Sequence, residues 1–141
     1  MEVSNLQPRL LGIDYGDARI GLAVSDELGF LAHPLETIHC QKTHPLKRIA
    51  EVVHEKAIAK IILGLPLRLN STEGPAAEKV RAFAKRLQSE IPDSPIEFID
   101  ESYSTMDAQK KLHEAGRNTK NSKPIIDQAA AVVILQSYLD A

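Results

Sequence analysis

The chain has 141 residues, a length that predicts a single domain over residues 1–141 with a real buried core. Its net charge of −2 and its hydrophobic fraction of 43% are ordinary for a globular protein, and the charge counts mildly against nucleic-acid binding, since nucleic-acid-binding domains are usually basic. A single cysteine, Cys40, excludes an internal disulfide framework and a cysteine–zinc cluster, and the sequence has no signal-like or membrane-spanning apolar run, so we expect a cytoplasmic protein.

The first forty residues predict three strands with short connections. Residues 9–14 form an apolar run that ends in an acid, and residues 20–25 alternate large and small side chains. A third strand is expected over residues 35–40, after Pro34. Residues 15–18 (YGDA) have the composition of a turn, so the first two strands should form a hairpin.

The middle of the chain predicts helices that alternate with strands. Apolar residues recur at helical spacing over residues 45–57 and again over residues 77–91. Short buried strands are expected over residues 60–63 and 96–100, and residues 65–75 read as a loop by composition.

Two further helices are predicted in the last third of the chain. A sequence that resembles a capping box begins one helix at Ser104, and Gly116 closes it. Residues 117–123 (RNTKNSK) are predicted to be a polar loop. The final helix is expected from Pro124 to about Asp140.

This order of elements predicts an α/β fold with one mixed sheet. The first three strands should pair antiparallel, because short turns join them. The two later strands follow helices, so they should add in parallel through right-handed crossovers. The expected molecule is a five-stranded sheet flanked by about four helices.

Acidic residues stand at the ends of elements that such a fold would bring together. Asp14 ends the first strand, Asp100 and Glu101 end the last, and Asp127 lies in the first turn of the final helix, on the stripe that faces the sheet. Converging carboxylates raise one another's pKa or recruit a cation, and hard oxygen ligands favour Mg²⁺ or Mn²⁺. Two such ions, about 4 Å apart, can activate a water and stabilise the leaving oxygen of a phosphodiester. The pattern therefore indicates a metal-dependent hydrolase of nucleic acid.

Each of these acids, taken alone, also has a simpler structural explanation. An aspartate at a strand end, such as Asp14, is usually a turn former, and the pair Asp100-Glu101 fits a solvated strand end. Asp127 fits an acid stabilised by a helix dipole. The histidines show no metal-ligand spacing, and no GxxxxGK[ST] nucleotide-binding loop is present. Only the set of acids in this element order favours a metal site.

Basic and polar side chains near the acids are candidates for contacts with phosphate. Arg68 and Asn70 lie in the loop predicted after the fourth strand, where they could donate hydrogen bonds to phosphate oxygens. Between residues 103 and 123, five basic residues outnumber two acidic ones. A local positive patch of this kind can bind nucleic acid although the whole chain is slightly acidic.

Four segments together carry a resemblance to a known family. They are GIDYGDARIGLAVSD (12–26), ILGLPLRLNSTEGP (62–75), FIDESYST (98–105) and KPIIDQAAAVVILQSYLD (123–140). They are spread across nearly the full length of the chain, in the order of the family. The ordered set resembles the YqgF family, also called RuvX, which has a ribonuclease H-like fold.

The resemblance implies an endonuclease that acts on the 5′ end of pre-16S rRNA during ribosome biogenesis. By position in the motifs, it assigns Asp14, Glu101 and Asp127 as the catalytic acids. The same residues would hold Mg²⁺ or Mn²⁺, expected as two ions. The partner implied is structured RNA.

One position departs from the family pattern. Ser102 stands where the family usually has an arginine after the D-E pair, which removes one contact to phosphate or to the fold. The resemblance leaves Arg19, Arg68 and Lys123 to supply cationic contacts instead, with Asn70 as a further donor.

Other functions stay open on the sequence. A RuvC-type Holliday junction resolvase shares the fold and the acids and would cut branched DNA. A non-catalytic nucleic-acid-binding factor fits the modest acidity of the chain and the missing arginine. An actin-like or sugar-kinase-like ATPase is disfavoured, because such proteins enclose nucleotide between two domains of this kind. No membrane partner is expected, and the sequence does not set the oligomeric state.

Overall fold

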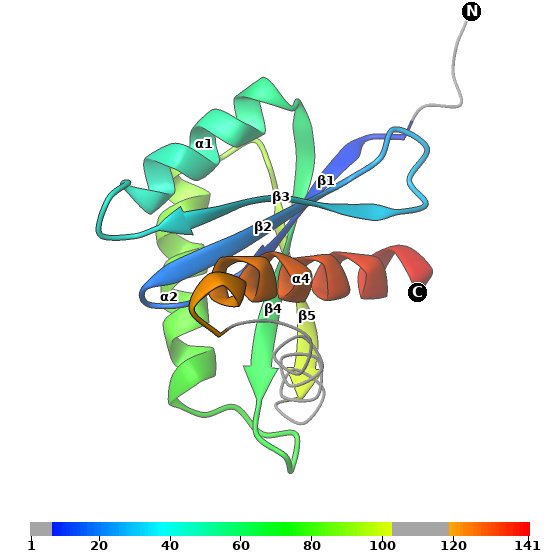
Figure 1. The fold of residues 1–141 in the computed structure, drawn as a ribbon. Coiled ribbons are helices and arrows are strands. Elements are labelled where there is room, and N and C mark those ends of the chain that lie inside the picture. The colour runs from blue at the N-terminus through cyan, green and yellow to red at the C-terminus, as the bar shows by residue number, and fades with distance from the viewer. Residues whose placement is uncertain (1–6, 103–118) are drawn as a thin grey trace, which may run out of the picture.

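The computed structural model describes residues 7–102 and 119–141, and the side chains of residues 7–101 and 126–141. Short turns and crossovers join the elements in the order that the sequence predicts (Figure 1). The described elements, in chain order, are β1 (Arg9–Asp14), β2 (Arg19–Ser25), β3 (Ala32–His39), α1 (Pro45–Glu55), β4 (Ile58–Leu67), α2 (Pro75–Glu90), β5 (Ile96–Ser102) and α4 (Thr119–Asp140).

The five strands form one mixed sheet in the order β3-β2-β1-β4-β5. β1 pairs antiparallel with β2, and β2 pairs antiparallel with β3. β4 joins the other edge of β1 in parallel, and β5 continues the sheet in parallel with β4. The predicted α/β fold with a mixed five-stranded sheet is therefore confirmed.

The ends of several elements differ from the sequence prediction. β3 begins at Ala32 rather than after Pro34 and ends at His39, because a strand at the sheet edge can include a proline. β4 does not end at Gly64 but continues to Leu67, because it pairs with β5 along this whole stretch. The last helix begins at Thr119, so residues 119–123 are helical rather than a loop. Polar composition does not by itself fix chain conformation, and most helical stability comes from the packing of a helix's apolar part.

The helix predicted between Ser104 and Gly116 lies outside the described residues, so three of the four expected helices can be compared. The earlier start of α4 also moves Asp127 from the predicted first turn to a position eight residues inside the helix. The helix dipole acts within the first turn, and it therefore does not explain this acid.

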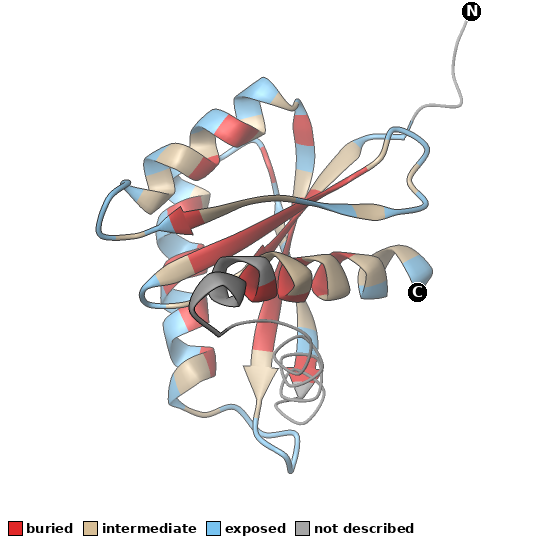
Figure 2. Cartoon of the chain, in the orientation of Figure 1, coloured by how far each residue is buried: buried red, intermediate tan, exposed pale blue. Residues whose placement is uncertain are grey.

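The hydrophobic core forms two layers, one on each face of the sheet (Figure 2). α1 and α2 cover one face, and α4 lies across the other (Figure 1). Under α1 and α2, the fully buried side chains include Leu11, Ile13, Ile49, Leu63 and Leu87. Under α4, the buried residues are Ala23, Ile62, Ala131, Ile134 and Leu135.

Glycines on the sheet let α4 lie close to it. A Cβ at Gly12 would come 2.7 Å from the Cβ of Leu135, and a Cβ at Gly21 would overlap the backbone oxygen of Asp127. The strands under α4 are therefore low in side-chain bulk where the helix crosses them. Within the described residues, no helix has both the length and the apolar content to cross a membrane.

Candidate active site

The carboxyl ends of the parallel strands β1, β4 and β5 meet at one edge of the sheet. Asp14 is the last residue of β1, and its cross-strand neighbour on β2 is Gly21. Two strands away, Glu101 on β5 pairs with Pro66 on β4. This edge is the usual place for a functional site in a sheet with parallel strands.

Asp14 and Glu101 both face the α4 side of the sheet. Two residues before Asp14, Gly12 lies against Leu135 of α4. Two residues before Glu101, Ile99 packs against the cluster under α4. Because side chains two residues apart on a strand share a face, the two acids point to the same side.

Asp100 faces α2 instead. Phe98, two residues earlier in the strand, packs against the core under α1 and α2. The guanidinium of Arg81 lies over its ring, 4.9 Å from the centroid. The pKa of Arg81 is raised first by its hydrogen bond to Glu73 and also by the charge of Asp100. Strand alternation thus separates the two acids of the D-E pair, and only Glu101 lies on the side of Asp14.

Asp127 reaches the same edge from α4. Its backbone oxygen lies over Gly21, the cross-strand neighbour of Asp14. Its side chain is buried, and the Nε of Arg19 donates a hydrogen bond of 2.7 Å to its Oδ2. The prediction that Asp127 faces the sheet is confirmed, while its cationic partner, 108 residues away in the chain, carried no sequence signal.

Glu101 is a buried acid with an unfavourable environment for its charge. Only 7% of the residue is exposed, and burial raises the pKa of its carboxyl group. Within the part of the chain whose side chains are described, no cation pairs with it. A carboxylate buried in this way gains free energy either by taking up a proton or by binding a cation.

The structure brings the three acids to one edge and one face but does not gather them around a single point. Among the described residues, no three histidine, cysteine, aspartate or glutamate side chains are close enough to hold a metal ion together. Glu101 is separated from Asp14 by β4, and Asp127 is held by Arg19. The donor set, which consists of carboxylate oxygens, nevertheless suits Mg²⁺ or Mn²⁺.

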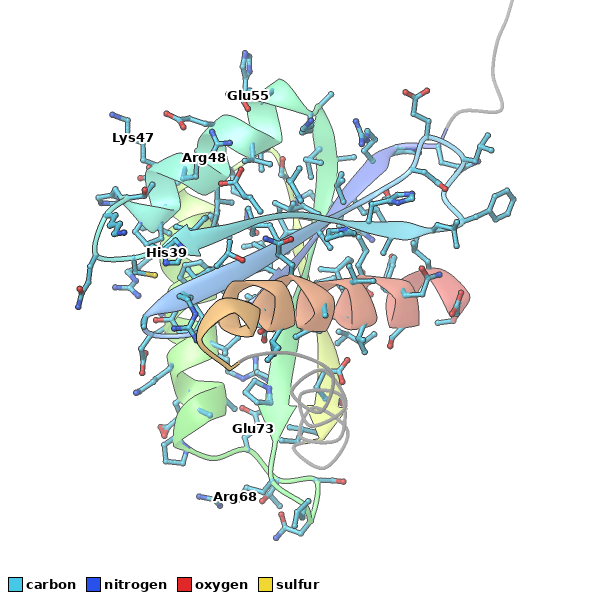
Figure 3. The ribbon with its side chains drawn as sticks, in the orientation of Figure 1. His39, Lys47, Arg48, Glu55, Arg68 and Glu73 are labelled. Carbon is cyan, nitrogen blue, oxygen red and sulfur yellow. The ribbon has the colours of Figure 1, made fainter. Side chains whose placement is uncertain are left out.

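Two of the predicted phosphate contacts, Arg68 and Asn70, lie in the loop that leaves β4 at this edge. Figure 3 labels Arg68 in this loop. Arg68 follows the last residue of β4, and its backbone N–H donates to the carbonyl of Thr72 at 2.8 Å. The Oδ1 of Asn70 accepts hydrogen bonds from the Thr72 N–H and hydroxyl, at 3.2 and 2.6 Å. Asn70 therefore shapes the loop that presents Arg68.

Of the other two predicted phosphate contacts, Arg19 and Lys123, only Arg19 has a described side chain. Arg19 lies at the start of β2, beside the acids, with 31% of its side chain exposed. It could therefore touch a phosphate while it holds Asp127. The side chain of Lys123 and the predicted basic patch between residues 103 and 123 lie outside the described side chains.

Comparison with known proteins identifies the family. The sequence model of a family described as "RuvX: Holliday junction resolvase" matches residues 8–141. This chain belongs to the RuvX family. The family resemblance inferred from the four segments is therefore confirmed.

Curated members of the RuvX family match this chain over most of its length. A protein of Cutibacterium acnes is 45% identical over 130 residues, which cover 92% of this chain and 81% of that protein. A protein of Acetivibrio thermocellus is 44% identical over 135 residues, which cover 94% and 96% of the two chains. Both are named "Putative pre-16S rRNA nuclease". As a RuvX protein, the chain is a nuclease, a hydrolase that acts on ester bonds.

Solved structures support the fold of this RuvX protein. RuvC of Thermus thermophilus in complex with a Holliday junction substrate gives a TM-score of 0.54 at 16% identity, with 94% of each chain covered. A second Thermus thermophilus RuvC structure gives a TM-score of 0.52 at 14% identity, with 93% of each chain covered. The similarity at this level of identity establishes the fold, which is ribonuclease H-like, as predicted.

Proposed function

We propose that this RuvX protein is a metal-dependent endonuclease that processes the 5′ end of pre-16S rRNA in the cytoplasm. The observation that carries the proposal is the position of Asp14, Glu101 and Asp127 at one sheet edge, on the α4 side. Two of these acids are buried, which is costly for a carboxylate unless a positive charge is near. The names of the curated relatives support precursor rRNA as the substrate.

The three acids would hold Mg²⁺ or Mn²⁺, in our proposal as two ions. The fit rests on the oxygen donors and on Glu101, whose buried carboxyl group has a raised pKa and no cationic partner in the described chain. When bound, such ions lower the pKa of an attacking water and neutralise the charge of the leaving oxygen. The three acids are not gathered around one point in this structure. Metal binding therefore requires the Asp127 carboxylate to release Arg19, at least partly, and to contact the ion instead.

The residues of the chain itself contribute orientation and exclusion of water. Arg19 sets the direction of the Asp127 carboxylate through its 2.7 Å hydrogen bond. The close packing of α4 on Gly21 keeps water away from one side of the acids. We expect Arg68, in the loop beyond β4, to bind a phosphate next to the one that is cut.

The proposal is tested by cleavage of a precursor rRNA fragment in the presence of Mg²⁺ or Mn²⁺. Asp14→Asn and Glu101→Gln are each expected to lose at least about 100-fold in rate, since loss of even an outer partner of a metal ligand costs about 10–100-fold. Asp100→Asn is the matched control, because it removes the neighbouring charge on the other face and should retain activity. Unchanged cleavage by Asp14→Asn would refute the site assignment.

A second candidate function is cleavage of four-way DNA junctions. The description of the family as a Holliday junction resolvase favours it, and so does the fold shared with a RuvC bound to such a junction. The same purified protein should be offered a junction and a precursor rRNA at equal concentration. Faster turnover of the junction would replace the RNA proposal, and absence of turnover on both would favour a binding factor.

A further inference from the structure

Three adjoining hollows lie around Tyr15, on the α2 side of the sheet. Tyr15 and Asp17 line all three of them. One hollow, of about 500 Å³, follows α2, the second reaches the start of α2 at Pro75, and the third reaches the start of α1 at Pro45. We call this continuous surface the Tyr15 groove. Its wall on α2 consists of Lys79, Ala82, Lys85, Arg86 and Ser89.

The wall on α2 follows from the helical repeat. Lys79, Ala82, Arg86 and Ser89 recur every three or four residues, so they form one stripe beside the buried stripe of the helix. Ala82 and Ser89 are small and leave space between the long cationic side chains. Lys79 and Arg86 are seven residues apart, which corresponds to about 10 Å along the helix.

The groove is positively charged although the protein is not. Lys79, Lys85 and Arg86 line it against one carboxylate, that of Asp17, whereas the whole chain has a net charge of −2. Asp17 pairs with Lys79 at 2.9 Å, but both side chains are more than 60% exposed, so the pair is weak and opens easily. In the described part of the chain, no acid forms an ion pair with Lys85 or Arg86.

The groove and the acids lie on opposite faces of the same sheet edge. Tyr15 follows Asp14 directly, and its ring packs on Phe83 of α2 with centroids 4.5 Å apart. Asp14 faces α4, as shown above. A strand of nucleic acid that passes over this edge would therefore meet the acids on one side and the groove on the other.

We propose that the Tyr15 groove binds the sugar–phosphate backbone of a single RNA strand next to the phosphate that is cut. Three features of the groove support this: its row of cations, the open space between them, and Tyr15, which follows Asp14 directly in the chain. Backbone contacts of this kind position the nucleic acid and do not read its sequence. The identity of the polymer as RNA rests on the proposed function, while the groove itself rests on its own charge and shape.

The test is binding of a fluorescent 20-nucleotide single-stranded RNA, measured by anisotropy in EDTA so that no cleavage occurs. Each phosphate contact on a single strand contributes about 0.7 to the slope of log affinity against log salt. Lys85→Gln and Arg86→Gln should each flatten the slope by about 0.7, which corresponds to about fivefold weaker binding at 0.1 M salt. Binding of a single-stranded DNA of the same sequence is measured in parallel, which shows whether the groove prefers RNA to DNA.

Two matched variants control for net charge. Lys56→Gln, at the carboxyl end of α1, changes the net charge by the same amount away from the groove and should bind like the unmodified protein. Asp17→Asn removes the opposing carboxylate inside the groove and releases Lys79, so it should bind more tightly. Opposite effects from neighbouring residues cannot come from misfolding, and thermal unfolding followed by circular dichroism confirms that each variant is folded.

A direct measurement uses the unmodified protein. Bound RNA should protect Lys79 and Lys85 from acylation, detected by mass spectrometry, and should leave Lys56 reactive. Equal loss of binding in Lys56→Gln, or no change in any groove variant, would overturn the inference without affecting the cleavage proposal. Loss of cleavage in Asp14→Asn with intact RNA binding would support both, and a protein that binds no RNA at all would overturn the groove and the RNA substrate together.

Discussion

Arg19 and Asp127 lie 108 residues apart in the chain and form a 2.7 Å ion pair beside Asp14. Asp127 is buried, with 12% of its side chain exposed, so loss of this partner is costlier than it would be for a surface acid. The pair gives Arg19 a positioning role at the candidate site. It also means that a metal ion and Arg19 compete for the same carboxylate.

Arg19→Ala should destabilise the protein. Removing the cation leaves the Asp127 carboxylate buried without its hydrogen bond, at a cost of about 1–3 kcal/mol in the free energy of unfolding. Millimolar Mn²⁺ should restore part of the loss, because the ion can replace the guanidinium. Urea unfolding with and without Mn²⁺ measures both effects. Lys79→Ala removes a partner of an exposed acid and should cost much less than Arg19→Ala, so an equal loss in both variants would contradict the prediction.

Glu101 should make stability fall as the pH rises. Its pKa is raised above the ordinary value near 4.5, so its contribution is fully present below pH 4.5 and is lost as the pH rises through the higher pKa of the folded state. Glu101→Gln, which cannot ionise, should therefore gain stability over the unmodified protein at pH 7 and not at pH 4. Thermal unfolding across this range in EDTA provides the measurement.

Glu36→Gln is the control, because the pKa of Glu36 is shifted in the opposite direction to that of Glu101. Hydrogen bonds from Arg48, at 2.8 and 2.9 Å, lower the pKa of Glu36. Its contribution is therefore present above pH 4.5 and lost as the pH falls through the lowered pKa. Glu36→Gln should lose stability at pH 7, by less than about 1 kcal/mol because both side chains are partly exposed. A gain at pH 7 in both variants would show that burial of Glu101 is not the cause.

The elements of this protein follow from local sequence signals, while their close packing depends on single glycines. Pro45 and Pro75 stand at the first positions of α1 and α2, as expected of proline at a helix start. The alternation of residues 20–25 correctly predicts a strand with little bulk on one face. The start of α4 was predicted wrongly, since polar residues can also occupy the end of a helix.

Gly21→Ala should push α4 away from the sheet. The added Cβ would overlap the backbone oxygen of Asp127, and backbone in a helix cannot move alone, so we expect a loss of about 3 kcal/mol or more. Gly64→Ala is the comparison, because its Cβ would meet the terminal Cδ1 of the Ile134 side chain at 2.5 Å rather than helix backbone, so we expect a smaller loss. Urea unfolding compares the two, and a loss in Gly64→Ala as large as that in Gly21→Ala would contradict this view of the α4 contact.

At the scale of the whole molecule, one sheet supports two cores. The cluster under α1 and α2 and the cluster under α4 share the strands β1, β2 and β4. Loss of either layer exposes one face of the same strands, so the two should unfold together. The single domain predicted over residues 1–141 would require the same cooperative unfolding.

A pair of conservative core variants tests this cooperativity. Ile61→Val, under α1 and α2, and Ile134→Val, under α4, each remove one buried methylene and should each cost about 1 kcal/mol. Both variants should keep a single urea transition with the same slope, shifted to lower urea concentration. A second transition in either variant would show that the two layers unfold independently.

The sequence by itself determined the order of the described elements, the mixed sheet and the family, and it singled out the three candidate acids, because these depend on local periodicity and on motifs that stay together in the chain. The tertiary structure decided which acid of the D-E pair lies on the side of Asp14, that Arg19 holds Asp127, and that Tyr15 joins the acids to a cationic groove. These facts depend on strand register, on the α4 contact and on the surface between α2 and β1. Such contacts join residues far apart in the chain, and no local pattern records them.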